Sequence, residues 1–232
     1  MMWSPAGAFG PLTAPPSAPL TQPVQSPPGQ AQIASYGGLH AAVWAENLKD
    51  VMALISAGAK LEARDGHGRT PLMLAAYRKN HAIAKALIKA GADLNAREHS
   101  AYDLLTISSV LNDVEMVKLA IAAGADTKLV TSPYDGTALI ASAHLGHVEV
   151  VKALIAGGAP LDHVNNLNWT ALIEAIVLGD GGKNHVETLR ALVEAGADLN
   201  LADGNGVRPL ALALRRGYTE MSDILKAAGA KP

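Results

Sequence analysis

The chain of 232 residues contains no cysteine, which excludes disulfide bonds, cysteine-ligated zinc and thiol catalysis together. Aromatic residues are also scarce, with one Phe, five Tyr and three Trp. Because aromatic rings normally dominate protein cores, we expect this core to be aliphatic and rich in alanine. No apolar run reaches the roughly 18 residues that a membrane-spanning helix needs, so we expect a soluble chain.

The sequence also lacks any block of like charges. Its 19 Lys and Arg residues nearly balance 21 Asp and Glu residues, which gives a formal net charge of -2. Nucleic-acid binders and basic membrane-surface proteins both need a cationic footprint. We therefore expect no nucleic-acid partner and no insertion into a membrane.

No charged side chain occurs before Glu46, and residues 1–33 hold eight of the thirteen prolines. Each proline fixes φ and removes a backbone donor, so we interpret residues 1–33 as a tail or linker without helix, in polyproline II or disordered form. The basic region and unbroken apolar region of a secretory signal are both missing, so the cytoplasm is the expected location. A periplasmic or secreted location stays open if a signal sequence was removed.

From residue 34 onward the tripeptide Gly-Ala-x recurs with spacings of 33, 33, 34, 38 and 33 residues. Its glycines are Gly58, Gly91, Gly124, Gly158, Gly196 and Gly229. A period of this size is typical of repeat proteins, in which each unit buries its apolar face only against its neighbours. Two apolar columns with helical spacing predict a hairpin of two helices in each unit. We expect six units, with boundaries near 34–64, 65–97, 98–130, 131–164, 165–202 and 203–232.

Local signals predict where the helices of each unit begin and end. Thr70, Thr137 and Thr170 suit the cap of a first helix, and Pro71 suits its first position. The glycine of Gly-Ala-x suits the end of the second helix, because it adopts a left-handed backbone without strain. Five extra residues, 179–183, lengthen the turn between the two helices of the fifth unit.

These motifs resemble the ankyrin repeat, most closely over Asp65 to Asn95, where Gly68-Arg69-Thr70-Pro71-Leu72 and Gly91-Ala92-Asp93-Leu94-Asn95 match its pattern. The resemblance covers residues 36–231. It implies an all-α solenoid of stacked helix-turn-helix hairpins with β-turn fingers and no true sheet. It also implies a scaffold that is not an enzyme, needs no cofactor and binds other proteins through a concave groove. The histidine of the family's Thr-Pro-Leu-His motif is absent, so its hydrogen bonds between repeats cannot be carried over.

Aromatic side chains fall at positions that the resemblance assigns to this groove and to the fingers. One column of the first helix, just after paired small residues, contains Trp44, Tyr77, Val110, His144, Val177 and Arg215. Exposed Tyr and Trp side chains are typical binding anchors. The predicted partner-binding residues are Trp44, Tyr77, Tyr102, Tyr134, His144 and Trp169. We expect the partner to be another protein, or the Pro-rich tail of this chain or a neighbouring copy, which would give self-association.

Glu174 is a carboxylate in a column that is otherwise apolar. The other members of its column are Ala41, Leu74, Ile107, Ala141 and Leu212. Such a group must find polar partners or become neutral. We interpret Glu174 as satisfied by neighbouring groups, and we keep it, with Asn166, as a candidate ligand contact.

An alternative function is a small-ligand or catalytic site in repeats three to five, around Tyr134, His144, Trp169 and Glu174. The residue types suit it, but no nucleophile and base recur at a fixed spacing, so we assign no catalytic residue. A closed pocket at these residues would favour this alternative, whereas an open groove would favour partner binding.

Two further motifs carry structural interpretations. His144 and His147 have helical metal-ligand spacing, but Gly146 interrupts the helix between them and no third ligand follows. The glycine-rich stretch 179–184 lacks the Ser or Thr and the preceding strand of a phosphate-binding loop. We therefore expect turn capping at the first, a lengthened turn at the second, and no metal site.

Overall fold

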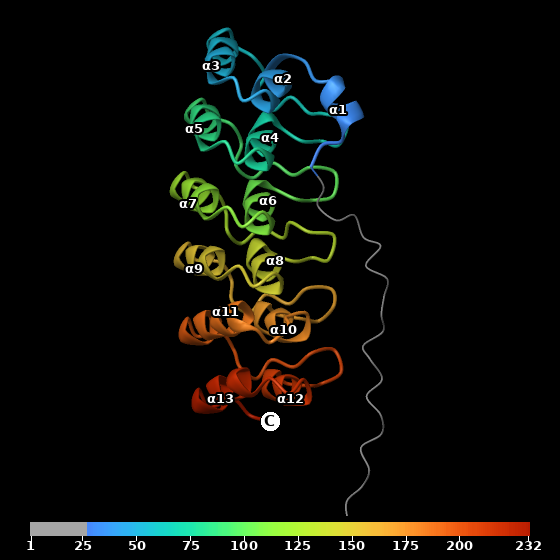
Figure 1. Ribbon diagram of the computed structural model, residues 1–232, viewed down its shortest axis with the longest axis vertical. Coiled ribbons are helices and arrows are strands. Elements are labelled where there is room, and N and C mark those ends of the chain that lie inside the picture. Colours follow the sequence, from blue (N-terminus) through green and yellow to red (C-terminus); the bar gives the residue numbers. More distant parts are fainter. Residues whose placement is uncertain (1–26) are drawn as a thin grey trace, which may run out of the picture.

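Helical hairpins repeat along residues 27–232, the part of the chain that the computed structural model describes (Figure 1). Within this part no residue belongs to a β-strand, which confirms the predicted all-α solenoid. Most of the predicted tail, residues 1–26, lies outside the described residues.

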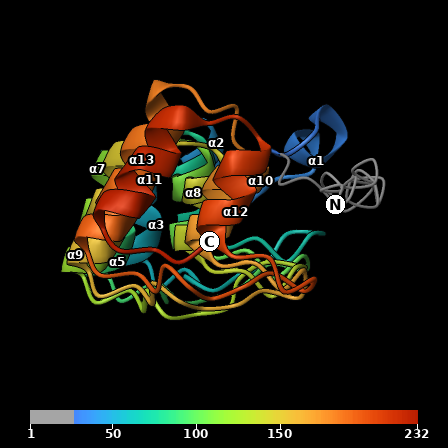
Figure 2. The same cartoon turned by 90° about the horizontal axis from the view of Figure 1, so that it is seen from below.

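Each unit contributes one helix to an inner row and one to an outer row, and Figure 2 shows both rows with the connecting loops projecting to one side. The inner helices are α2 (Gly38–Trp44), α4 (Pro71–Tyr77), α6 (Leu104–Val110), α8 (Ala138–His144), α10 (Ala171–Val177) and α12 (Pro209–Arg215). The outer helices are α3 (Leu48–Ser56), α5 (His81–Lys89), α7 (Val114–Ala122), α9 (Val148–Ala156), α11 (Lys183–Glu194) and α13 (Thr219–Ala227). The extra residues of the fifth unit form a turn that leads into the long helix α11.

The inner helices begin at side-chain caps, as the sequence predicts. Thr70, Thr137 and Thr170 each accept a hydrogen bond from the backbone N–H three residues later. Asp103 does the same for α6, with 2.8 Å between its Oδ1 and the Thr106 nitrogen. Each cap satisfies a helix donor that would otherwise lack a partner.

The outer helices end at the glycine of Gly-Ala-x. Gly91 and Gly124 have φ angles of 94° and 97°, a region that side chains with a Cβ atom resist. The N–H of the following alanine returns to a carbonyl of the last helical turn, as in Ala92 to Leu87. This turn sends the chain away from the helices toward the next finger.

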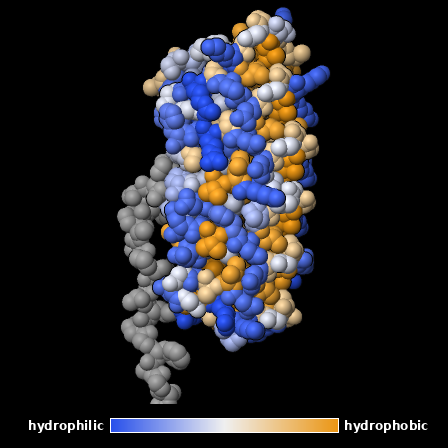
Figure 3. Space-filling view, turned by 180° about the vertical axis from the view of Figure 1, so that it is seen from behind, coloured by the Kyte–Doolittle hydropathy of each residue, from blue (hydrophilic) through white to orange (hydrophobic). Residues whose placement is uncertain are grey.

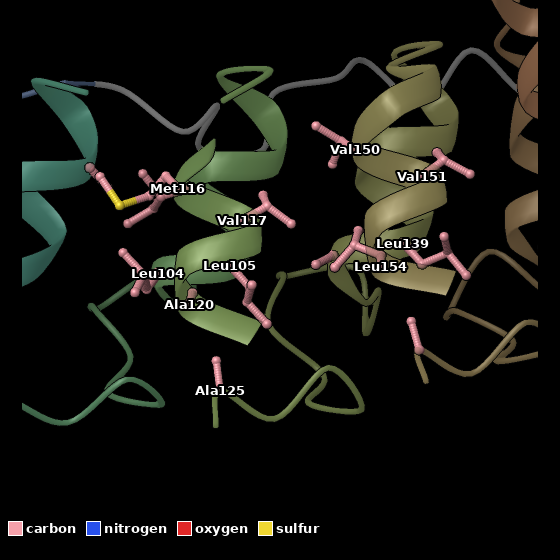
Figure 4. Packing of buried hydrophobic residues seen from close by; sticks show 14 of the residues in the cluster. Leu104, Leu105, Met116, Val117, Ala120, Ala125, Leu139, Val150, Val151 and Leu154 are labelled. Carbon is pink, nitrogen blue, oxygen red and sulfur yellow. The ribbon is translucent and has the colours of Figure 1, made fainter. Parts of the chain in front are cut away.

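The core is aliphatic, as predicted, and no aromatic residue is among the buried hydrophobic residues of the described part. One column of inner-helix leucines is at most 3% exposed: Leu72, Leu105, Leu139, Leu172 and Leu210. Figure 4 shows such side chains, with Val117, Val151 and Leu154 of the outer helices, filling the space between neighbouring hairpins. Burial of one such side chain stabilises the fold by about 1.5 to 3 kcal/mol.

Between units the chain forms fingers, which are turns closed by backbone hydrogen bonds. Asp65 N–H donates to the Arg69 carbonyl, and Asn165 N–H donates to the Trp169 carbonyl, each over 3.0 Å. Neighbouring fingers are also joined, since His99 N–H donates to the His67 carbonyl over 2.9 Å. The fingers are thus held in a row beside the inner helices.

The sequence predicts no helix in residues 1–33. This prediction is wrong for residues 30–33, because helix α1 spans Gln30–Ala34. The prolines end at Pro28, so the backbone donors that a helix needs are available from Gly29 onward. The Gln32 side chain accepts the Gly29 N–H over 2.8 Å and caps the start of the helix. The part of the chain that can form a helix therefore begins at Gly29, before the repeat pattern starts at residue 34.

Seen from behind, the surface carries an apolar band along the side of the outer helices (Figure 3). In residues 27–232, no helix has both the length and the apolar character needed to cross a membrane.

Candidate binding groove

The predicted groove column coincides with the ends of the inner helices. Trp44, Tyr77, Val110, His144, Val177 and Arg215 are the last residues of α2, α4, α6, α8, α10 and α12. The fingers follow one another along the stack on the side of the inner helices (Figures 1 and 2), and we call the face made by the fingers and these helices the candidate groove. The repeat geometry places one such residue in each unit along the stack.

Trp44 lies at the first end of the groove, in contact with charged and aromatic neighbours. The Tyr36 ring meets it edge-on, with 6.3 Å between centroids. The Arg78 guanidinium carbon lies 5.1 Å from the Trp44 ring centroid, a cation–π distance. Trp44 is half-buried and packs partly on the core, so it is not a purely exposed anchor.

Tyr77, Tyr102 and Tyr134 follow one another along the groove. Burial raises the pKa of Tyr77 to about 12, although the positive charge of Arg69 opposes the shift. Burial also raises the pKa of Tyr102, and the neighbouring Glu98 and Tyr134 raise it further. Tyr77 and Tyr102 also pack partly on the core, whereas the sequence predicts that the core needs no ring.

In the fifth unit, Asn165 organises the finger that carries Trp169. Its Oδ1 accepts the N–H groups of Leu167 and Trp169, each over 3.0 Å. Asn168 has a φ angle of 61°, the left-handed conformation that Gly68 and Gly206 adopt in two other fingers. This finger is tied to the preceding one, since the exposed Asn166 donates from its backbone N–H to the Tyr134 carbonyl over 2.9 Å. These hydrogen bonds hold the backbone of the half-buried Trp169 in place.

Glu174 is only 3% exposed, and it joins this finger to the inner helices. Its Oε1 accepts a hydrogen bond from the Asn165 side-chain amide over 2.9 Å. His144 Nδ1 lies 3.3 Å from Oε2, but Oε2 has no hydrogen-bond partner among the described residues. The structure therefore brings together Asn165, Trp169, Glu174 and His144, from two neighbouring units.

The two histidines of the His144–His147 motif face different partners. His147 Nδ1 lies 2.8 Å from the Ser109 carbonyl, while His144 faces Glu174, so the two imidazoles do not converge. Over residues 27–232, no three His, Asp or Glu side chains gather as a metal-binding group. Two surface hollows lie elsewhere, one lined by α11 and α13 and one at the open end of the first unit. Neither includes Tyr134, His144, Trp169 or Glu174.

Sequence reasoning missed the contacts that helix α1 makes with the second finger, residues 65–69 at the start of the second unit. The Gln32 side-chain amide lies against the imidazole of His67, and Arg69 Nη1 donates to Gln32 Oε1 over 3.3 Å. The Tyr36 hydroxyl donates to Asp65 Oδ2 over 2.8 Å. Figures 1 and 2 both place α1 on the inner-helix side of the stack. Helix α1 therefore lies at the N-terminal end of the stack, beside α2 and α4.

The hydrogen bond between Tyr36 and Asp65 changes the pKa values of both side chains. Burial, followed by the hydrogen bond to Asp65, raises the pKa of Tyr36 to about 12. Although burial pushes the other way, hydrogen bonds from the Arg69 N–H and the Tyr36 hydroxyl hold the pKa of Asp65 below its usual range. The signal in the sequence was Tyr36 itself, an aromatic residue just before the first repeat column.

Comparisons with known proteins agree with this architecture. The family model for ankyrin repeats in three copies matches residues 104–203, and the model for a single ankyrin repeat matches residues 67–99. Among curated proteins, the ankyrin repeat protein YahD of Escherichia coli is 40% identical over 98 residues, which are 42% of this chain and 49% of YahD. The chain thus spans about half the length of YahD. The ankyrin repeat and KH domain-containing protein mask-1 of Caenorhabditis elegans is 36% identical over 85 residues, 37% of this chain and 3% of mask-1.

Solved structures give broader coverage. A crystallised ankyrin repeat domain from Acinetobacter baumannii has a TM-score of 0.80 and 41% identity, covering 83% of this chain and 98% of that domain. A second crystallised ankyrin repeat protein has a TM-score of 0.77 and 32% identity, covering 82% of this chain and 96% of its own. Repeat period, helix ends, finger turns and these likenesses agree, and the chain belongs to the ankyrin repeat family.

Proposed function

We propose that this chain binds a partner protein through the concave groove and finger turns, with repeats four and five at the centre of the contact. Ankyrin repeats generally mediate protein–protein interaction rather than catalysis, which supports this class of function. The groove supplies aromatic rings from the inner-helix ends and the fingers, and polar groups surround them.

The distribution of exposed apolar side chains carries the proposal. The described part exposes seven large hydrophobic residues, and four of them lie at the inner-helix ends or the fifth finger of repeats four and five. These four are Leu145, Val164, Leu167 and Leu178. Tyr134 and Trp169 belong to the same two repeats. Apolar and aromatic side chains that gather within a polar surround are typical of a protein-binding surface.

The experiment begins with partner selection. A library of random peptides displayed on phage would be selected against the full chain, and the dissociation constants of the selected peptides would be measured by calorimetry. Trp169→Ala and Tyr134→Ala should each weaken groove-binding peptides by about 2 kcal/mol or more if these rings are hot spots. Because both rings lie outside the core cluster, their removal should change the free energy of unfolding by only about 0.5 kcal/mol.

Leu172→Ala is the matched control, because Leu172 is 1% exposed and lies on the same inner helix as Glu174. It should lower the free energy of unfolding by about 2 to 5 kcal/mol through the cavity that it leaves. If Trp169→Ala and Tyr134→Ala unfold the chain as severely as Leu172→Ala, the rings are structural. If they leave peptide affinity unchanged, the groove is not the binding surface.

A further inference from the structure

The carboxylate of Glu174 is buried in the wall of the groove with half of its hydrogen-bonding capacity unused. Its residue is 3% exposed, Oε1 is bonded to Asn165, and Oε2 has no hydrogen-bond partner among the described residues. A buried carboxylate in this state is costly to the fold. The other units have an apolar residue at this position, so the fold itself does not need the carboxylate.

Asn165, the finger residue that contacts Glu174, also departs from the repeat pattern. Asp65, Glu98 and Asp203 occupy the position of Asn165 in other fingers, and their carboxylates accept the same two backbone N–H groups. Each of these acids stands nine residues before an apolar inner-helix residue, as Asp65 stands before Leu74. Asn165 stands nine residues before Glu174 and provides an NH₂ donor that an acid would lack. The two departures from the repeat pattern are therefore complementary, and together they hold one carboxylate oxygen in place.

The second oxygen, Oε2, is buried, and the side chain of His144 lies within ion-pair distance of it. His144 Nδ1 lies 3.3 Å from Oε2 without forming a hydrogen bond, and the His144 side chain is 41% exposed at the end of α8. Among the described residues, no Lys or Arg lies within ion-pair distance of Glu174. Because Oε2 is buried, a ligand reaches it only if a neighbouring side chain moves, and the half-exposed His144, 3.3 Å away, is the candidate for that movement.

We propose that Glu174, held by Asn165, is the anchor of a recess for a cationic side chain, guanidinium or ammonium, of the bound partner. This inference rests on the proposed binding function and names the chemistry of the partner at one point of the groove. A cation satisfies both the free acceptor and the buried negative charge, whereas a neutral donor satisfies only the acceptor and an anion is repelled. The exposed Leu145 and Leu178, at the ends of α8 and α10, suit the aliphatic stem of Lys or Arg.

The direct test uses methylguanidinium chloride as the probe and N-methylurea as its neutral counterpart, at equal ionic strength. Nuclear magnetic resonance of the full chain would follow the Asn165 side-chain NH₂ signals during each titration. Methylguanidinium should shift these signals saturably, and its affinity should exceed that of N-methylurea severalfold. Glu174→Leu restores the residue type found at Leu74 and Leu212, so the chain should stay folded while methylguanidinium affinity falls by about tenfold or more. Equal binding to wild type and to Glu174→Leu overturns the proposal.

His144→Ala tests whether Glu174 or His144 holds the cation. If Glu174 holds it, this variant should bind methylguanidinium at least as well as the wild type, because it removes the imidazole that lies 3.3 Å from Oε2. A loss of binding would make His144 the anchor and would overturn the assignment to Glu174.

The peptides selected on the groove complete the test. Replacing one Arg or Lys of a bound peptide by Ala should weaken binding to the wild type by about tenfold or more, and binding to Glu174→Leu by less than about twofold. If peptides bind the groove but no basic residue is coupled to Glu174, the cation recess is wrong while the binding function stands. If methylguanidinium binds through Glu174 but no peptide binds the groove, the recess stands and the proposed function fails.

Discussion

Individual residues that depart from the repeat pattern carry the most information in this protein. Asn165 and Glu174 each break a column, and the structure shows that they break it as a hydrogen-bonded pair. Either change alone leaves a conflict. An acid at 165 would face the Glu174 carboxylate, and a leucine at 174 would leave the Asn165 amide without an acceptor.

A double-mutant cycle over this pair tests the argument. Asn165→Asp alone should lower the free energy of unfolding by about 2 kcal/mol or more, because it buries two carboxylates side by side. The double variant Asn165→Asp with Glu174→Leu recreates the pattern of the second unit and should recover most of the loss. Urea unfolding at pH 7.5 gives all four free energies, and purely additive effects would contradict the pairing.

A second prediction at this scale concerns alkaline pH. The pKa of Tyr77 is raised to about 12 from 10.0, so the folded state keeps its proton where the unfolded state loses it. The corresponding stability is fully present below pH 10 and is lost as pH rises through about 12. Tyr77→Phe removes the titrating group, so its free energy of unfolding should fall less steeply over this range than that of the wild type. Denaturant unfolding at several alkaline pH values measures the difference, and equal slopes would contradict the burial of the phenol.

At the scale of elements, the caps, glycines and apolar columns of each hairpin act locally. Helix α1 is different, since it precedes the repeats and is held by side-chain contacts with the second finger. Gln32 is half-buried and His67 is exposed, and contacts at exposed groups contribute little to stability. We therefore expect the aliphatic stack to fold without this helix.

Deleting residues 1–33 should therefore lower the thermal midpoint by only about 2 to 4 °C, the shift that corresponds to about 1 kcal/mol in a chain of this size. Tyr36→Phe, which leaves α1 in place, should cost about 1.5 kcal/mol because it removes a hydrogen bond to the charged Asp65. Differential scanning calorimetry on both variants makes the comparison. A fall of many degrees after the deletion would show that the front of the chain is part of the folding unit.

At the scale of the whole molecule, each unit contacts only its neighbours, so stability is close to a sum of units and interfaces. The same core column should therefore behave differently at an end and in the middle. Leu39 and Leu172 occupy this column in the first and fifth units and are 4% and 1% exposed.

Leu39→Ala should increase amide hydrogen exchange mainly in the first unit, because loss of its packing frays one end of the stack. Leu172→Ala should increase exchange in the fourth, fifth and sixth units, since it weakens both interfaces of its unit. Hydrogen exchange measured by mass spectrometry resolves the two patterns. A uniform increase along the chain in both variants would show that the stack unfolds as one cooperative body.

The sequence by itself determined the properties that repeat along the chain. The period, the Thr and Pro helix starts, the Gly ends and the aliphatic columns predict the hairpins and their stacking, because each depends on neighbours close in sequence or one repeat away. The same periodicity predicts the column that the ankyrin resemblance assigns to the groove, and its members are the last residues of the inner helices, from Trp44 to Arg215.

Only the tertiary structure decided which exceptions meet one another. Helix α1 lies against a finger more than thirty residues away, and His144 lies against Glu174 of the next unit. Glu174 looks like an isolated polar residue in the sequence, because its partners lie outside its own helix. The packing of the units sets the distance between a finger, the inner helix of its own unit and the inner helix of the preceding unit. A periodic pattern shows which residue type each position usually has, but not which groups an exceptional side chain contacts.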